Sequence, residues 1–290
     1  MSRSMAEPRI APAPGTPFAH SGATAGRIDD STVGAAVEAG GLAAAHADRV
    51  GNDALLLLDS DAWVLLTPIG VRRQALEGAP AAQLERLKID TLARNAPLRV
   101  VVHDMWLRHL VVSWPKGVSG RAERDAWLAH RFRDVHGASG PEWTLATDRD
   151  SIGSSVLASA VPTALLAAIH VFVRRHRLRL DGVVGDFVAS FNRWQPGFRE
   201  SRDSLGALAV IRGRRVTAGL WRDGEWRAMR SQAFVGENAS ATLANMLDTW
   251  TLTEAGARGS DLLPVGVLHA IGPDVDAPAG WRLERCVVRR

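Results

Sequence analysis

Apolar residues from position 54 onward follow patterns typical of strands and helices in alternation. Ala54 to Leu58 is an unbroken apolar run, which indicates a buried strand, and Trp63 to Thr67 forms a second one after the polar turn Asp59-Ser60-Asp61. These two runs predict a β-hairpin. Residues 1–52, by contrast, are rich in Pro, Gly, Ala, Ser and Thr and lack sustained apolar periodicity, so we expect them to form a disordered tail.

The rest of the chain repeats the order of strands followed by helices. Helices are expected at 82–95, 122–135, 164–175 and 239–250, and strands at 99–103, 107–114, 143–147, 156–161, 182–191, 208–211, 216–221, 226–229, 262–269 and 281–288. The turn Asp223-Gly224 is a strong hairpin signal. Two variants of one α/β unit are therefore predicted, lobe 1 at 53–195 and lobe 2 at 196–290, with the crossing between them at 195–204.

Composition places this body among ordinary globular proteins. The chain has 290 residues, of which 46% are hydrophobic, enough to bury a large core. Its longest apolar stretch, Val161 to Val173, is shorter than the ~20 residues of a membrane span, and the N-terminus lacks the apolar run of a secretory signal. The single cysteine, Cys286, excludes an internal disulfide and is expected to be an inert, packed thiol. We therefore expect a cytoplasmic protein with no direct membrane span.

The positive charge does not by itself indicate nucleic-acid binding. The formal net charge is +4, but the arginines are scattered among 31 acidic residues instead of forming a stripe. The densest cluster, Arg174 to Arg179, closes a predicted helix, where cations complement the helix dipole. No nucleic-acid partner is expected.

Motifs that carry chemistry are incomplete. The nine histidines show no metal-ligand spacing, the serines lack a nucleophile-elbow context, and no phosphate-binding P-loop occurs. No catalytic or metal-ligating residue is therefore predicted. The ten tryptophans fall mostly on predicted strands, which favours sheet packing and leaves an aromatic docking surface as the alternative.

Several local stretches, taken with the order of the elements, resemble a known family. They are Leu107-Arg108-His109-Leu110-Val111-Val112-Ser113-Trp114-Pro115, Arg124-Asp125-Ala126-Trp127, Ala158-Ser159-Ala160-Val161-Pro162 and Trp221-Arg222-Asp223-Gly224-Glu225-Trp226-Arg227. Across about residues 54–288 the chain resembles the actin-like family that includes PilM of type IV pili and the cytoplasmic part of GspL of type II secretion. The resemblance implies an α/β, actin-like (RNase H-like) duplicated two-lobe fold with mixed sheets.

Members of the wider actin-like superfamily bind ATP between the lobes, and the resemblance assigns the corresponding loops here. The first phosphate loop would be Asp59, Ser60 and Asp61, with aspartate where glycine is expected. The second would be Arg212, Gly213 and Arg214, without the usual acidic residue that places the metal, and the adenosine turn would contain Gly272 alone. Close backbone approach needs small residues, and Asp61 beside a triphosphate adds like-charge repulsion. We expect no cofactor, and weak ATP binding stays open.

Two functions follow from this resemblance. The first is a non-catalytic adaptor at the inner membrane, held there through protein partners of an assembly platform and connected to cytoplasmic components such as a motor ATPase. The second is a weak ATP-binding or sugar-kinase-like enzyme of the same superfamily. The degraded phosphate loops favour the adaptor.

Overall fold

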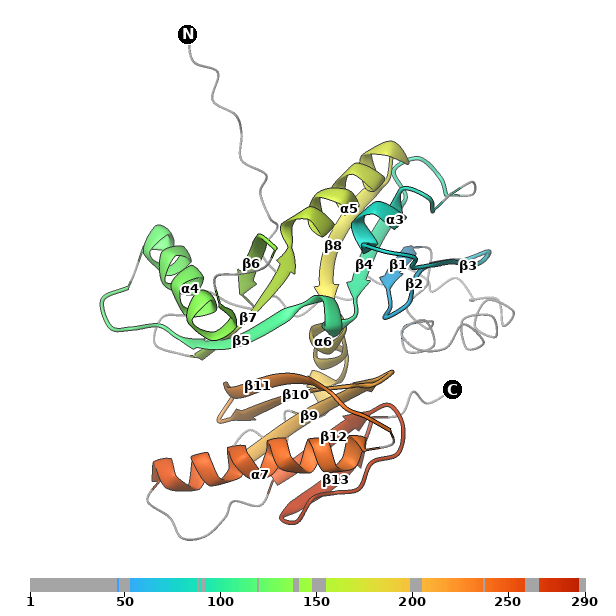
Figure 1. The fold of residues 1–290 in the computed structure, drawn as a ribbon. Coiled ribbons are helices and arrows are strands. Elements are labelled where there is room, and N and C mark those ends of the chain that lie inside the picture. The colour runs from blue at the N-terminus through green and yellow to red at the C-terminus, as the bar shows by residue number, and fades with distance from the viewer. Residues whose placement is uncertain are drawn as a thin grey trace.

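Two lobes, each built on a five-stranded sheet, make up the body of the protein (Figure 1). A computed structural model describes residues 46, 53–87, 89, 92–118, 120–137, 141–147, 155–198, 205–236, 238–258 and 266–286. The expected tail, residues 1–52, falls outside this range except for His46, which is buried.

The sheet of lobe 1 has the order β3-β2-β1-β4-β8. Its strands are β1 (Ala54–Leu58), β2 (Ala62–Thr67), β3 (Gly70–Ala75), β4 (Pro97–Val102) and β8 (Arg179–Gly185). β1, β2 and β3 form an antiparallel meander, whereas β4 and β8 run parallel to β1. β1 and β2 are buried along their whole length because every residue in them except Thr67 is apolar.

The sheet of lobe 2 repeats this arrangement strand for strand. Its strands are β9 (Leu205–Arg212), β10 (Arg215–Arg222), β11 (Glu225–Ala233), β12 (Gly266–Ile271) and β13 (Trp281–Arg285). They lie in the order β11-β10-β9-β12-β13, with an antiparallel meander followed by two parallel strands. The same topology occurring twice in one chain confirms the predicted duplicated, mixed-sheet, actin-like fold.

Four of the described helices pack on the faces of the two five-stranded sheets. They are α3 (Pro80–Leu84), α5 (Thr163–Arg175), α6 (Asp186–Phe198) and α7 (Ala239–Arg258). α3 and α5 pack over one face of the lobe 1 sheet, and α7 packs over the outer face of the lobe 2 sheet. α6 lies between the lobes (Figure 1), with Ala189 in the core of lobe 1 and Phe187 against the sheet of lobe 2.

A separate unit is inserted into lobe 1 between β4 and α5. It consists of η2 (Asp104–Trp106), β5 (Arg108–Ser113), α4 (Arg121–His136), β6 (Trp143–Thr147) and β7 (Ser155–Pro162). The three strands form a sheet of order β5-β7-β6. α4 covers one face through Leu128, and β5 and β7 lie against β11 of lobe 2 on the other side. The inserted unit therefore also bridges the lobes.

Two expectations about local structure were wrong, and one strand was missed. The strand expected at 182–191 ends at Gly185 and continues as helix α6. The helix expected at 82–95 is only α3, since the chain turns at Glu85 and Arg86. Leu87, Ile89 and Leu92 still pack into the same core from non-helical backbone, which explains their misleading spacing. β3 was missed because its sequence is polar and lies at a sheet edge.

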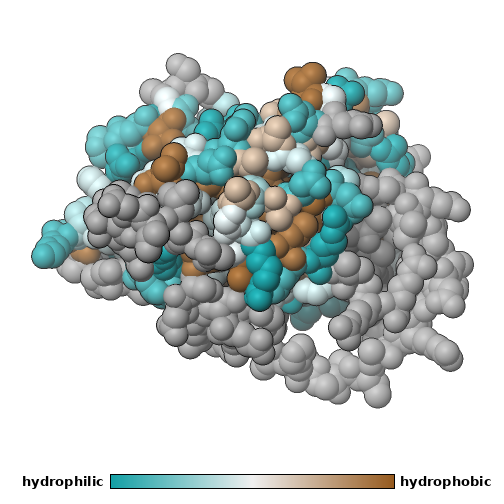
Figure 2. All heavy atoms as spheres, turned by 90° about the horizontal axis from the view of Figure 1, so that it is seen from below, coloured by the Kyte–Doolittle hydropathy of each residue, from teal (hydrophilic) through white to brown (hydrophobic). Residues whose placement is uncertain are grey.

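Apolar surface is dispersed on the face seen in Figure 2, where brown groups of atoms lie among teal ones. The exposed large apolar residues of the described chain are spread over different elements: Ile69, Val135, Val171, Val235 and Leu252. None of the described helices is both long enough and apolar enough to span a membrane.

Candidate functional site between the lobes

The structure brings the three expected cleft elements together. A Cβ placed on Gly213 would lie 4.0 Å from the Oγ of Ser60, so the turn after β9 faces the turn after β1. Gly272, with φ of 125°, lies so close to β9 that a Cβ there would meet the carbonyl oxygen of Ile211 at 2.4 Å. The positions assigned from the resemblance thus form one locality between the sheets.

The first turn is held by its own lobe. The Nε1 of Trp106 donates to the carbonyl oxygen of Asp59 at 2.9 Å, and the backbone N–H of Ser60 donates to the Asp59 carboxylate at 2.6 Å. Asp61 forms an ion pair with Arg73 of the edge strand β3, at 2.6 Å between Oδ2 and Nη2. The carboxylates of this turn are therefore engaged in local contacts.

The second turn directs one arginine inward. Gly213 has φ of 53°, the left-handed conformation that this tight turn requires. Arg212, whose side chain is only 11% exposed, places its Nε 3.3 Å from the Oδ2 of Asp186. Where an acidic residue would be expected to place a metal, this chain has a cation paired with a carboxylate from α6.

Asp186 is the centre of a buried ion network at the start of α6. Its Oδ1 lies 2.9 Å from the Nε2 of His46 and accepts a hydrogen bond from the Ser190 hydroxyl at 3.3 Å. Burial alone would raise the pKa of this carboxyl, but the Arg212 guanidinium and the hydrogen bond with His46 together lower it to about 2. Asp186 is thus ionised and charge-compensated at neutral pH.

A second polar network lies nearby. Ser159 Oγ is 2.9 Å from His109 Nδ1, and His109 Nε2 is 3.1 Å from the Oδ1 of Asp104. The order Ser-His-Asp is that of a catalytic triad, but the two ring nitrogens are exchanged, since a triad has the serine on Nε2 and the aspartate on Nδ1. The Asp104 carboxylate also accepts the backbone N–H of Phe187 at 3.1 Å. Asp104 therefore anchors the first turn of α6 to lobe 1, which gives the network a structural role.

Aromatic rings fill the space between α6 and the lobe 2 sheet. The ring of Phe191 lies 4.7 Å from that of Trp226 and 5.6 Å from that of Trp221, centroid to centroid, and Phe187 lies 5.9 Å from Trp226. Gly219 makes this packing possible, because a Cβ there would come within 2.7 Å of Phe187 and 2.8 Å of Trp226. This set, with Leu157, Leu208 and Val210, is called the interlobe cluster below.

The cysteine of this interface lacks what a reactive thiol requires, and the described residues lack what a metal site requires. Cys286 packs half-buried against the interlobe cluster, and burial raises the pKa of its thiol to about 11, so it is a poor nucleophile, as expected. Among the residues that the structure describes, no three His, Cys, Asp or Glu side chains gather in a way that could hold a metal ion.

Sequence reasoning missed Asp186, the most buried charge of the site. The apolar run through 182–191 favoured a strand and left Asp186 without a role. Phe187 and Phe191 are four residues apart, with the polar Ser190 between them, and this helical spacing could have indicated a helix. An acidic residue directly before such a run is also typical of a helix start.

The fold and this interface define the class as a two-lobed protein with the actin-like fold. Solved structures similar to the chain include a Bacteroides thetaiotaomicron protein with an actin-like ATPase fold and unknown function, at 11% identity and a TM-score of 0.47, over 76% of this chain and 82% of that one. The PilM-PilN type IV pilus biogenesis complex is similar at 15% identity and a TM-score of 0.43, over 76% and 82%. No family model and no curated protein matches the chain.

A further similar structure is the cytoplasmic domain of EpsL, an inner membrane component of the type II secretion system of Vibrio cholerae. It is 12% identical with a TM-score of 0.45, over 81% of this chain and 90% of that one. At these identities the similarities concern the fold.

Proposed function

We propose that this protein is a non-catalytic cytoplasmic adaptor that resembles PilM or the cytoplasmic part of GspL. It would link an inner-membrane assembly platform of a pilus or secretion system to cytoplasmic components, and would reside at the membrane through protein partners. The observation that carries the proposal is the ion pair of Arg212 with the buried Asp186 at the place where a nucleotide's phosphates would be held.

The ion network disfavours phosphate transfer for an electrostatic reason. Phosphoryl transfer in this fold needs a carboxylate-held metal beside the γ-phosphate. Here the buried carboxylate beside the second turn, that of Asp186, is already neutralised by Arg212 and by the hydrogen bond with His46. Releasing it for a metal would leave the buried Arg212 without its partner, which is costly.

The interlobe cluster supports a rigid platform. Trp226, Phe187 and Leu208 are almost completely buried between the lobes, so opening a cleft would expose their apolar surface to water. Nucleotide-driven enzymes of two lobes depend on opening and closing. A fixed interlobe packing suits a scaffold that presents constant surfaces to its partners.

A second candidate function is weak ATP binding in a sugar-kinase-like enzyme. The observation in its favour is the approach of the two turns, with Ser60 facing Gly213 and with Arg214 beside it. Guanidinium groups bind phosphate well, so binding could occur without turnover.

An ATP experiment separates the two functions. Isothermal titration with Mg-ATP and an ATPase assay are carried out on the wild type and on Asp61→Ala. The adaptor predicts no turnover above a buffer blank in either protein, and weak or undetectable heat of binding. Saturable binding at ~10 μM or tighter, with turnover lost in Asp61→Ala, would contradict the adaptor and support the enzyme.

A further inference from the structure

The strand β3 is an open edge of the lobe 1 sheet. It is the last strand in the order β3-β2-β1-β4-β8, and within the described residues no strand pairs with its outer side. The backbone N–H of Leu76 donates to the backbone carbonyl oxygen of Asp61 at 2.7 Å, in continuation of the β2–β3 register. Since hydrogen-bonding residues alternate along an antiparallel strand, the backbone groups of Val71, Arg73 and Ala75 point outward. Such an edge is a template for an added strand.

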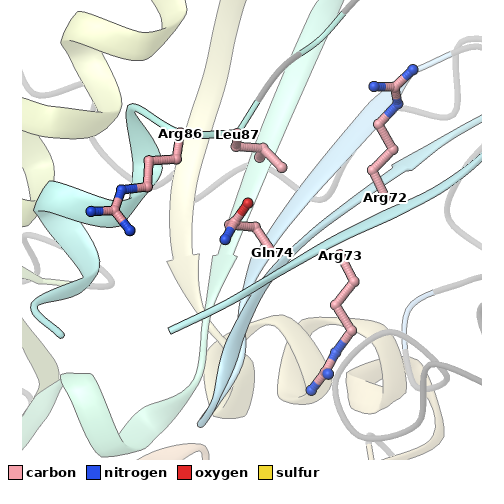
Figure 3. A pocket seen from close by; sticks show the side chains of 5 residues that line it. All are labelled: Arg72, Arg73, Gln74, Arg86 and Leu87. Atoms are coloured by element: carbon pink, nitrogen blue, oxygen red, sulfur yellow. The ribbon is translucent and has the colours of Figure 1, made fainter. Parts of the chain in front are cut away.

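A groove of about 470 Å³ lies beside this edge. It is formed by Arg72, Arg73 and Gln74 of β3 and by Arg86 and Leu87 after α3. Figure 3 shows Gln74 and Leu87 between the two elements, with Arg72 and Arg73 extending from β3 in opposite directions. An added strand would therefore have side-chain contacts next to its backbone partners.

The charge of the groove selects the ligand. Among the described residues, its lining contains three guanidinium groups and no carboxylate. Arg73 and Arg86 make ion pairs with Asp61 and Glu77, but both pairs are largely exposed. Exposed pairs of this kind are weak, so carboxylates of a ligand can replace them easily. Arginine also binds carboxylates in a bidentate geometry that lysine cannot match.

We propose that an acidic peptide segment of a partner protein binds in extended form along β3. Its backbone extends the lobe 1 sheet, and its carboxylates contact Arg72 and Arg86 across the groove. This inference rests on the proposed adaptor function, for which it names the chemistry of the partner. It concerns the outer edge of lobe 1, which touches the first turn between the lobes through the exposed ion pair of Arg73 with Asp61.

The probe is a fluorescent, end-capped peptide of about the length of β3, with Glu and Thr alternating, titrated with the full chain by anisotropy. We expect saturable binding. The double variant Arg72→Glu/Arg86→Glu should weaken it at least ~10-fold, since it replaces two attractions between opposite charges with two repulsions between like charges. The matched control is Arg282→Glu, which changes an exposed, ion-paired arginine on β13, the edge strand of lobe 2, and should leave binding unchanged.

Two further arms test the added strand itself. Ala75→Pro removes an outward N–H without changing the charge, and proline is tolerated at such an edge position. The same peptide N-methylated at alternate residues tests backbone pairing on the unaltered protein. Ala75→Pro should weaken binding ~2- to 10-fold, because one backbone hydrogen bond is lost. N-methylation should weaken it at least ~10-fold, because several are lost.

Three results would overturn the proposal: no binding by the acidic peptide at about 1 mM protein, equal binding by a peptide with Lys in place of Glu, or equal binding after N-methylation. The adaptor function is tested separately by ATP turnover. Loss of peptide binding with no turnover would reject this surface alone, and turnover with peptide binding would reject the adaptor alone.

Discussion

Lobe 1 and lobe 2 contain the same sheet but complete its two faces differently. In lobe 1 one face packs under α3 and α5 and the other against α6, all from its own part of the chain. In lobe 2, α7 covers the outer face, while the inner face is covered by Phe187 of α6 and Leu157 of the inserted unit. The core of lobe 2 is therefore completed by residues that precede it in the chain.

The connections between the parallel strands differ in the same sense. β4 and β8 are joined through the whole inserted unit and α5, whereas β12 and β13 are joined by residues 272–280, which contain no helix. Only the lobe 1 sheet therefore has helices from its own part of the chain on both faces. The interlobe cluster covers the inner face of the lobe 2 sheet instead of a helix of lobe 2. The contact between the lobes is therefore part of the hydrophobic core of lobe 2.

The largest effect should come from removing the fully buried ring that α6 contributes to the interlobe cluster. Phe187→Ala should lower the free energy of unfolding by about 3–5 kcal/mol, because the side chain is fully buried and leaves a cavity. Urea denaturation followed by tryptophan fluorescence measures this. Val171→Ala on α5, 44% exposed in the wild type, is the control and should change stability by less than ~0.5 kcal/mol. A loss below about 1 kcal/mol for Phe187→Ala would contradict the shared core.

The ion network between Asp186 and Arg212, which joins the lobes, should make the free energy of unfolding depend on pH. Asp186 has its pKa lowered from 3.8 to about 2, so its contribution is present above about pH 4 and is lost as pH falls through 2. Asp186→Asn should therefore be less stable at neutral pH, on the order of 2 kcal/mol, and should lose less stability than the wild type between pH 4 and 2.

Unfolding curves at several pH values measure this difference. The control is Asp125→Asn on α4, whose side chain is 69% exposed and whose variant should follow the wild-type curve. Parallel pH profiles of the wild type and Asp186→Asn would be the contrary result.

An added methyl group between the lobes should lower the free energy of unfolding by an intermediate amount. Gly219→Ala places a methyl group within 3 Å of Phe187 and Trp226, so we expect a loss of about 1–3 kcal/mol from overpacking. Gly78→Ala is the matched control, since a Cβ there meets only the Gln83 side chain at 3.8 Å. Thermal unfolding compares the two, and equal melting temperatures would show that the interlobe cluster yields without strain.

The smallest effect concerns the first turn. Trp106→Phe removes the hydrogen bond to the Asp59 carbonyl and keeps most of the ring, so it should cost about 1 kcal/mol. Amide hydrogen exchange at residues 59–61 should rise in the variant, whereas exchange at residues 212–214 should not change. A change at both turns would mean that they are coupled more tightly than their separate anchors indicate.

Much of the fold could be predicted because apolar periodicity reflects burial directly. β1, β2 and β9 consist almost entirely of apolar residues whose burial is decided by their own side chains. β3 could not be predicted, since its polar sequence, Gly70 to Ala75, becomes a strand through pairing with β2 alone.

The site was only partly predictable for a related reason. The turns at Asp59 and Arg212 are local features, so the resemblance located them and the structure places them together. The partners of these turns come from far along the chain: Asp186 from α6 and Trp106 from η2. Contacts between distant segments leave no periodic signal in a single sequence.

We expect lobe 1 and lobe 2 to be held in a single arrangement that Mg-ATP does not change. Spin labels at Val171→Cys on α5 and Leu252→Cys on α7, both exposed, in a Cys286→Ala background, report the distance between lobe 1 and lobe 2 by pulsed electron paramagnetic resonance. We predict the same narrow distance distribution with and without Mg-ATP, and a broader one when Gly219→Ala is added. A distribution that moves to a new distance on addition of Mg-ATP would contradict it, since it would reveal a working nucleotide cleft.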